Sequence, residues 1–81
     1  AEGPDAGARA ALRARLDRAE EHRDAVAERV RELRQRANVP VIRDVGEYQR
    51  LQQDLSAALD ELDQAETEVR RFRRALRRRA G

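Results

Sequence analysis

Arginine is the residue type in this chain with the clearest capacity for chemistry, because all 18 basic residues are arginines. Residues 67 to 81 hold seven of them and a single acid, whereas residues 47 to 66 hold six acids and a single arginine. A guanidinium group stays charged, and its planar fork binds two oxygens of a phosphate or carboxylate at once. The pattern therefore indicates anion binding, above all of phosphate backbones.

Candidate catalytic groups are few. The only serine, Ser56, lies in a predicted helix, and the chain has no cysteine, no lysine and no glycine-rich phosphate loop. The only histidine, His22, stands beside Glu20 and Glu21, so it is either a surface ion-pair partner of Glu61 or part of a metal or acid–base site. A metal site needs more converging ligands, which favours the ion pair. We therefore expect no catalytic residue, no cofactor and no metal.

Two apolar stripes at helical spacing show which elements position the arginines. Both alternate steps of three and four residues, the a/d pattern of a coiled coil. The first stripe comprises Leu12, Leu16, Ala19, Val26, Val30, Leu33 and Ala37, and the second comprises Tyr48, Leu51, Leu55, Ala58, Leu62, Ala65, Val69, Phe72 and Leu76. They predict an all-α fold, a two-helix antiparallel coiled-coil hairpin.

The ends of the helices have recognisable signals. Asn38 and Pro40 end the first helix, because the residue before a proline is restricted to extended conformations. Asp44 followed by Glu47 has the form of a capping box for the second. We predict a single domain over residues 1–81, with a helix at 6–37, a loop at 38–43 and a helix at 45–79.

The register of the hairpin is predicted from charge. In two alignments a positions face d positions near the loop, and the numbers of facing residues then add up to 81 or to 88. The first pairs Leu33 with Tyr48 and gives every flanking charged pair opposite signs, His22 with Glu61 among them. The second juxtaposes like charges, Glu20 with Glu66 and Arg13 with Arg73. Exposed ion pairs contribute only about 0.2–1 kcal/mol each, but several together favour the sum of 81.

Arg23 interrupts the first stripe at an a position, opposite Ala58 in this register. Either its aliphatic stem packs on the alanine while the guanidinium reaches Asp24, Glu20 or Glu61, or it is a polar specificity device or ligand contact inside the seam. We favour the first interpretation.

Two surfaces are candidate binding sites, one at each end of the hairpin. The predicted polyanion-binding residues gather where the chain termini lie: Arg9, Arg13, Arg70, Arg71, Arg73, Arg74, Arg77 and Arg78. The predicted partner-binding residues form an apolar group at the loop: Val39, Val41, Ile42 and Val45. Nucleic acid, the ribosome or an acidic protein would suit the first surface. The alternatives are that the arginines only solvate a helix end, and that the apolar group folds under against the seam.

Self-association is a further expectation. A single narrow seam in a chain of this length rarely supplies more than about 3–5 kcal/mol. Leu59 and Ala27 lie off the main seam, where they could extend an apolar face toward a second hairpin and form a four-helix bundle. A protein-interaction or oligomerisation module, acting through the apolar tip or this helix face, is therefore the alternative function.

The composition limits which other classes of protein this chain could belong to. With 42% charged and 2% aromatic residues, the chain has the character of a long solvated helical object rather than a globular core. It contains neither a signal-peptide apolar region nor a run of apolar residues that would span a membrane, so we expect a cytoplasmic location. The abrupt start and the ending in Arg79, Ala80 and Gly81 would also suit a fragment of a larger protein.

Residues 44 to 76 resemble a known kind of hairpin. Their pattern of Leu55, Ala57, Ala58, Glu61, Leu62, Ala65, Glu66, Val69 and Leu76 is similar to the second helix of the coiled-coil hairpin that ends many ABC-F ATPases, and to the arm of valyl-tRNA synthetases. Those hairpins are appended, non-catalytic modules that contact nucleic acid or ribosomal RNA. The resemblance implies the same role here, although Val69 stands near the position where the family usually has a tryptophan.

A second resemblance concerns small dimeric helical enzymes. The set Pro40, Val41, Arg43, Asp44 and Glu47, after a helix with Leu12, Arg13, Leu16 and Asp17, resembles the helical chorismate mutases. Those enzymes bind a dicarboxylate with arginines, so this resemblance implies an isomerase as a further alternative. The spacing from Arg13 to Arg29 departs by one residue from that family's catalytic pair.

Overall fold

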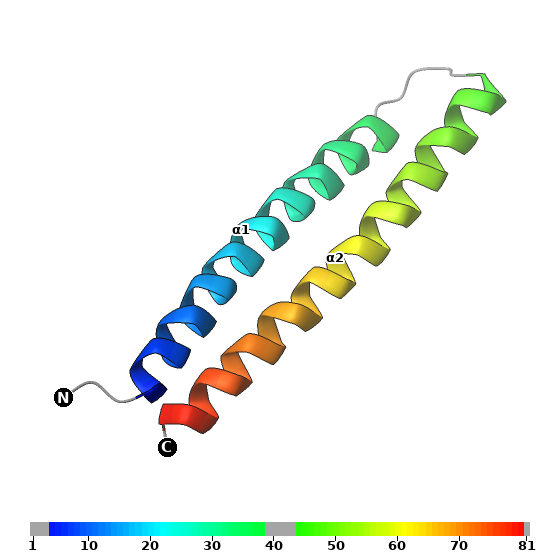
Figure 1. Cartoon of the computed structure of the whole chain (residues 1–81). Helices are drawn as coiled ribbons and strands as arrows, with labels where there is room; N and C mark the ends of the chain where they lie inside the picture. The colour runs from blue at the N-terminus through cyan, green and yellow to red at the C-terminus, as the bar shows by residue number, and fades with distance from the viewer. Residues whose placement is uncertain (1–3, 39–43, 81) are drawn as a thin grey trace.

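Two long antiparallel helices make up the hairpin in a computed structural model that describes residues 4–38 and 44–80 (Figure 1). Helix α1 spans Pro4–Asn38, and helix α2 spans Val45–Ala80. The molecule measures 66 × 16 × 14 Å, and the two chain termini lie at the same end. The predicted fold class, an all-α antiparallel helical hairpin, is confirmed.

The helix ends differ slightly from the predicted ranges of 6–37 and 45–79. Helix α1 begins two residues earlier, at Pro4, because a proline in the first turn has no N–H that would need a partner. It also includes Asn38, which the prediction assigned to the loop. The rest of the predicted loop, residues 39–43, lies outside the described residues.

Asp44 caps the start of helix α2. The backbone N–H of Glu47 donates to Asp44 Oδ1 at 2.9 Å, and the N–H of Tyr48 donates to the Asp44 carbonyl oxygen at 3.1 Å. A helix leaves its first N–H groups without partners, and a side-chain oxygen at this position satisfies one of them. The Asp44 half of the predicted capping box is thus present.

The core is a single seam between the helices. Buried apolar side chains form two clusters along it, with partly buried neighbours packed against each. The cluster toward the loop comprises Val30, Leu33, Leu51 and Ala58, with Ala37, Leu55 and Leu62 against it. The cluster toward the termini comprises Leu16, Ala19 and Val69, with Phe72 and Leu76 against it. Neither described helix has a stretch long and apolar enough to span a membrane.

The register along this seam is not the predicted one. Phe72 and Leu76 of α2 pack against the cluster that contains Leu16 and Ala19 of α1, as in the alignment whose facing numbers add up to 88. Tyr48, which the predicted alignment places on Leu33, is 52% exposed. The helices are therefore offset by one heptad from the alignment that sums to 81, and the first turn of α2 reaches past the end of α1 (Figure 1).

Burial of apolar side chains explains why this register forms and the predicted one does not. In the predicted alignment Phe72 and Leu76 would face Arg9 and Asp5, whereas in the observed one they pack on the cluster that contains Leu16. Burying a large apolar side chain contributes about 1.5–3 kcal/mol, more than an exposed ion pair. The prediction was wrong because it treated the two alignments as equal in apolar area.

Candidate polyanion-binding site

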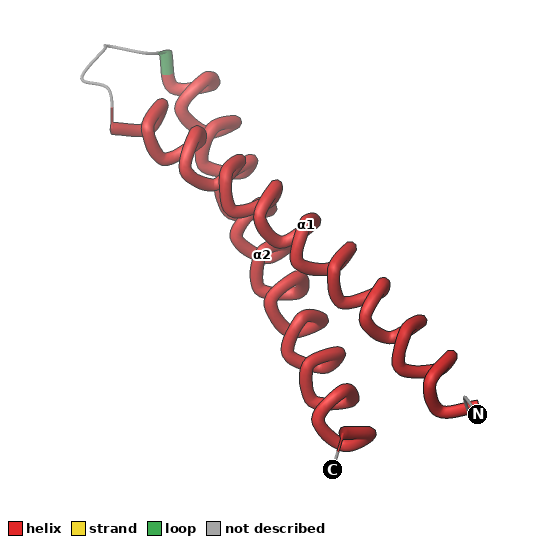
Figure 2. Tube along the Cα trace, turned by 90° about the vertical axis from the view of Figure 1, so that its left-hand side faces the viewer, coloured by secondary structure: helices red, strands yellow, loops and turns green. Residues whose placement is uncertain are grey.

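An open groove of about 640 Å³ lies between the helices at the end that holds the termini. In the view of Figure 2 the helices separate toward this end. Helix α1 supplies one side of the groove and α2 the other. The lining residues are Arg13, Leu16, Glu20, Arg70, Arg73, Arg74, Leu76 and Arg77. Among the described residues, five arginines and one acid therefore line this groove.

Helical spacing explains why four of these arginines meet. Arg70, Arg73, Arg74 and Arg77 follow one another at steps of three, one and three residues, so they share one face of α2. Arg13 reaches the same groove from α1, because the observed register sets it beside Leu76. The groove thus presents guanidinium groups from both helices.

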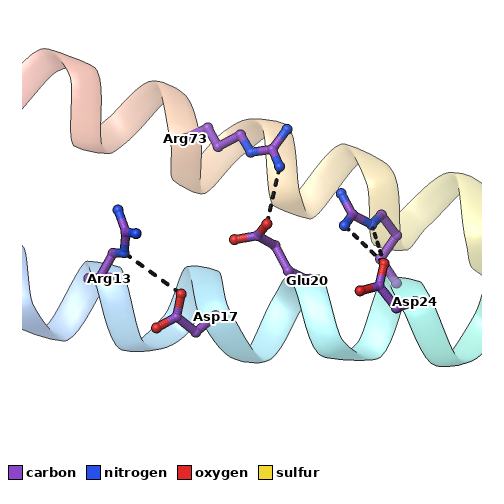
Figure 3. Close-up of polar contacts among 6 residues, drawn as sticks. Arg13, Asp17, Glu20, Asp24 and Arg73 are labelled. Atoms are coloured by element: carbon purple, nitrogen blue, oxygen red, sulfur yellow. Dashed lines mark hydrogen bonds and ion pairs between the residues drawn. The ribbon is translucent and has the colours of Figure 1, made fainter.

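Two of the five arginines are paired with carboxylates. Arg73 Nη2 lies 3.1 Å from Glu20 Oε2, and Arg13 Nε lies 3.7 Å from Asp17 Oδ1 (Figure 3). These contacts relieve the conflict between Arg13 and Arg73 that argued against this register, because each arginine reaches an acid instead of facing the other arginine.

The other three arginines of the groove have no ion pair within the described residues. Arg70 Nη2 donates to the neutral hydroxyl of Thr67 at 3.2 Å, and Arg74 and Arg77 make no ion pair in that part of the chain. All three side chains are exposed. Three cationic forks are therefore free to bind an anion from outside.

The structure brings together five of the eight predicted polyanion-binding residues. Arg9 lines an adjoining groove that shares Arg13 and Leu76, so it extends the same surface. Arg71 and Arg78 are not among the residues that line this groove, and Arg71 instead lines a separate groove with Asp63 and Thr67. Glu20 is the groove residue that the prediction did not include. The sequence feature that could have revealed it is its heptad position next to the apolar seam (position e), because the observed register brings residues at that position within reach of Arg73.

At the loop end, the described part of the predicted apolar group is exposed. Val45 is 71% exposed, so it does not fold under against the seam. Val39, Val41 and Ile42 lie outside the described residues.

His22 and Arg23 take the positions of the simpler interpretations. The predicted pair of His22 with Glu61 is present, with Nε2 at 3.6 Å from Oε1 and both side chains about half exposed. It is a flanking pair of the alignment that sums to 81, and it forms here despite the offset of the seam. Arg23 donates from Nε and Nη2 to Asp24 Oδ1 at 3.1 and 2.9 Å. In the observed register the residue that faces Arg23 is Ala65 instead of Ala58. Among the described residues, no group of three or more His, Cys, Asp or Glu side chains could hold a metal ion.

Fold and site together define a class: an antiparallel two-helix hairpin with an arginine-lined groove at its terminal end. The sequence matches no family model, and searches of curated proteins and of solved structures also return no match.

Proposed function

We propose that this hairpin is a non-catalytic binding module whose arginine-lined groove binds the phosphate backbone of a nucleic acid. The observation that carries the proposal is the set of three exposed arginines, Arg70, Arg74 and Arg77, on one face of α2 without an ion pair in the described part of the chain. Arginine forks bind phosphate oxygens two at a time, and such contacts provide most of the non-specific affinity for nucleic acid.

The composition of the groove favours a duplex over a single strand. No aromatic side chain lines it; Phe72 packs in the seam and contributes to a different groove on the other side. Single strands are bound by stacking bases on aromatic rings, whereas a duplex is held through its phosphates. A guanidinium group is also a poor proton donor or acceptor near neutral pH, which supports a binding role.

The direct test is titration of a short labelled duplex RNA and DNA with the protein over a range of salt concentrations. Substituting Arg70, Arg74 and Arg77 together by Gln is expected to weaken binding about tenfold or more. The slope of log affinity against log salt concentration should fall by an amount equivalent to about two to three phosphate contacts.

The matched control replaces three exposed arginines near the loop, Arg29, Arg34 and Arg50, by Gln, which lowers the net charge equally. We expect it to keep most of the affinity. Equal loss in both variants would contradict a defined site, and equally tight binding of polyglutamate would identify an acidic protein rather than nucleic acid as the partner.

A second candidate function, contact with another protein through the loop end, is favoured by one observation. The first turn of α2 exposes Val45 at 71% and Tyr48 at 52%, so two large apolar side chains lie beyond the seam. Exposed apolar groups often mark a contact surface. This candidate predicts self-association or partner binding that is lost on changing Val45 and Tyr48 to Asp and is unaffected by the groove substitutions.

A further inference from the structure

One face of α2 carries an unbroken stripe of charges that changes sign halfway along. At steps of three or four residues it contains first acids and then arginines, in the order Asp60, Asp63, Glu66, Arg70, Arg74 and Arg77. Steps of this size keep all six side chains on one side of a helix. We call this set the charged stripe; all of its members are exposed.

The members of the charged stripe make no ion pair within the described residues. Glu66 and Arg70 are spaced for an i, i+4 pair, but Arg70 instead donates to Thr67 Oγ1. Asp63 accepts a hydrogen bond from the Thr67 hydroxyl only through its main-chain carbonyl oxygen, so its carboxylate is not engaged there. Within the described part of the chain, the stripe thus has three acids without an ion pair followed by three arginines without one.

When two copies of such a surface run in opposite directions, the acids of each copy face the arginines of the other. We propose that the charged stripe is a homodimer interface, in which the α2 helices of two copies lie antiparallel and cross near Glu68. In this arrangement Glu66 of one copy faces Arg70 of the other. Asp63 faces Arg74 in the same way, and Asp60 faces Arg77. The two-fold axis repeats each of these three pairs, as expected for an isologous contact.

Leu59 supports the same arrangement. It precedes the acids on this face and is one of three large apolar side chains that are exposed among the described residues. In the antiparallel dimer it lies beneath Arg77 and Arg74 of the other copy. Arginine stems cover apolar surface while their charged heads reach acids, so Leu59 would lose its exposure. A parallel dimer would instead place acids on acids and arginines on arginines, which is repulsive.

This inference goes beyond the proposed function, since it assigns a second ligand to the same arginines. The acids of a second copy occupy the positions that phosphates would take, so duplex binding and self-association compete. Self-association is measured without nucleic acid, and duplex binding is measured at dilute protein, so either proposal can fail without the other.

Engineered cysteines test the geometry, because the chain has none of its own. Thr67→Cys places two thiols close to the proposed axis, whereas Ser56→Cys places them roughly 37 Å apart along it at about 1.5 Å per residue. At low salt and under mild oxidation, we expect a disulfide-linked dimer from T67C and little from S56C. Equal cross-linking of both variants, or none of T67C, overturns the antiparallel arrangement.

Charge exchange tests the pairing itself by sedimentation equilibrium. We expect the unmodified chain to dimerise at low salt and to dissociate at high salt. One variant carries D60R, D63R and E66R, and the other carries R70E, R74E and R77E; each alone should self-associate about tenfold more weakly or worse. Mixed in equal amounts, the two variants should form a heterodimer. A monomeric unmodified chain at low salt, or mixing without recovery, overturns the proposal.

Discussion

Arg73 Nη2 lies 3.1 Å from Glu20 Oε2, although 53 positions separate the two residues in the chain. The pair joins the two helices across the groove, and it fits the register whose facing residues add up to 88 better than the one that sums to 81, which sets the two residues a further heptad apart. It also keeps one arginine of the groove occupied by an internal acid. Register and anion binding are therefore linked through this contact.

Replacing Glu20 by Gln should strengthen duplex binding. The substitution removes the only acid among the described residues that line the groove and releases Arg73, so we expect affinity at low salt to rise about threefold to tenfold. Because the Arg73 side chain is 50% exposed, the loss of folding stability should stay below about 1 kcal/mol. Fluorescence anisotropy with labelled duplex measures the first and urea unfolding the second.

Glu32→Gln is the control for this prediction, since it changes the net charge equally but lies 12 residues from Glu20 along α1. A similar gain in both variants would attribute the effect to net charge and not to the groove.

The observed register predicts opposite outcomes for the two aromatic residues. Phe72 packs against the cluster of Leu16, Ala19 and Val69, so Phe72→Ala should destabilise the hairpin by about 2 kcal/mol. Tyr48 is 52% exposed, and Tyr48→Ala should cost less than about 1 kcal/mol. Chemical unfolding followed by circular dichroism would measure both. The reverse order of the two losses would favour the alignment that sums to 81.

Asp44 should contribute measurably to stability through its cap. Asp44→Ala leaves the Glu47 N–H without its side-chain acceptor and is expected to destabilise the hairpin by about 1 kcal/mol. Asp44→Asn keeps an acceptor oxygen and should retain most of that contribution. If the two variants unfold at the same urea concentration, the hydrogen bond is not what stabilises this helix end.

The two helical glycines should respond differently to alanine. A Cβ at Gly7 would meet nothing within 4 Å, so Gly7→Ala should stabilise the hairpin by about 0.5–1 kcal/mol through helix propensity. A Cβ at Gly46 would lie 3.2 Å from Asp44 Oδ1, tight enough to disturb the cap. Gly46→Ala should therefore gain less than Gly7→Ala in thermal unfolding; a larger gain would contradict the cap geometry.

Local sequence signals were sufficient for the helices and for much of the site. The apolar periodicity predicted both helices, the Asp44 signal predicted the cap, and arginine spacing predicted that Arg70, Arg73, Arg74 and Arg77 share a surface. The register was predicted wrongly, because two alignments of repeating stripes differ mainly in which residues at the stripe ends are left without an apolar partner. Phe72 and Leu76 determine that outcome, and their contribution appears only when both whole alignments are compared.

Arg23→Leu should stabilise the hairpin, because it completes the apolar stripe of α1. The Arg23 side chain is 27% exposed, and within the described residues its guanidinium bonds only to the neighbouring Asp24. The observed register sets it opposite the small, buried Ala65. A leucine there would bury apolar surface worth about 1 kcal/mol, which for a chain of this size raises Tm by about 4–8 °C. Arg31→Leu is the matched control: it removes one arginine from the same helix, but that side chain is 67% exposed and no gain is expected. A fall in Tm for Arg23→Leu alone would show that the guanidinium has a structural role in the seam that its bond to Asp24 does not account for.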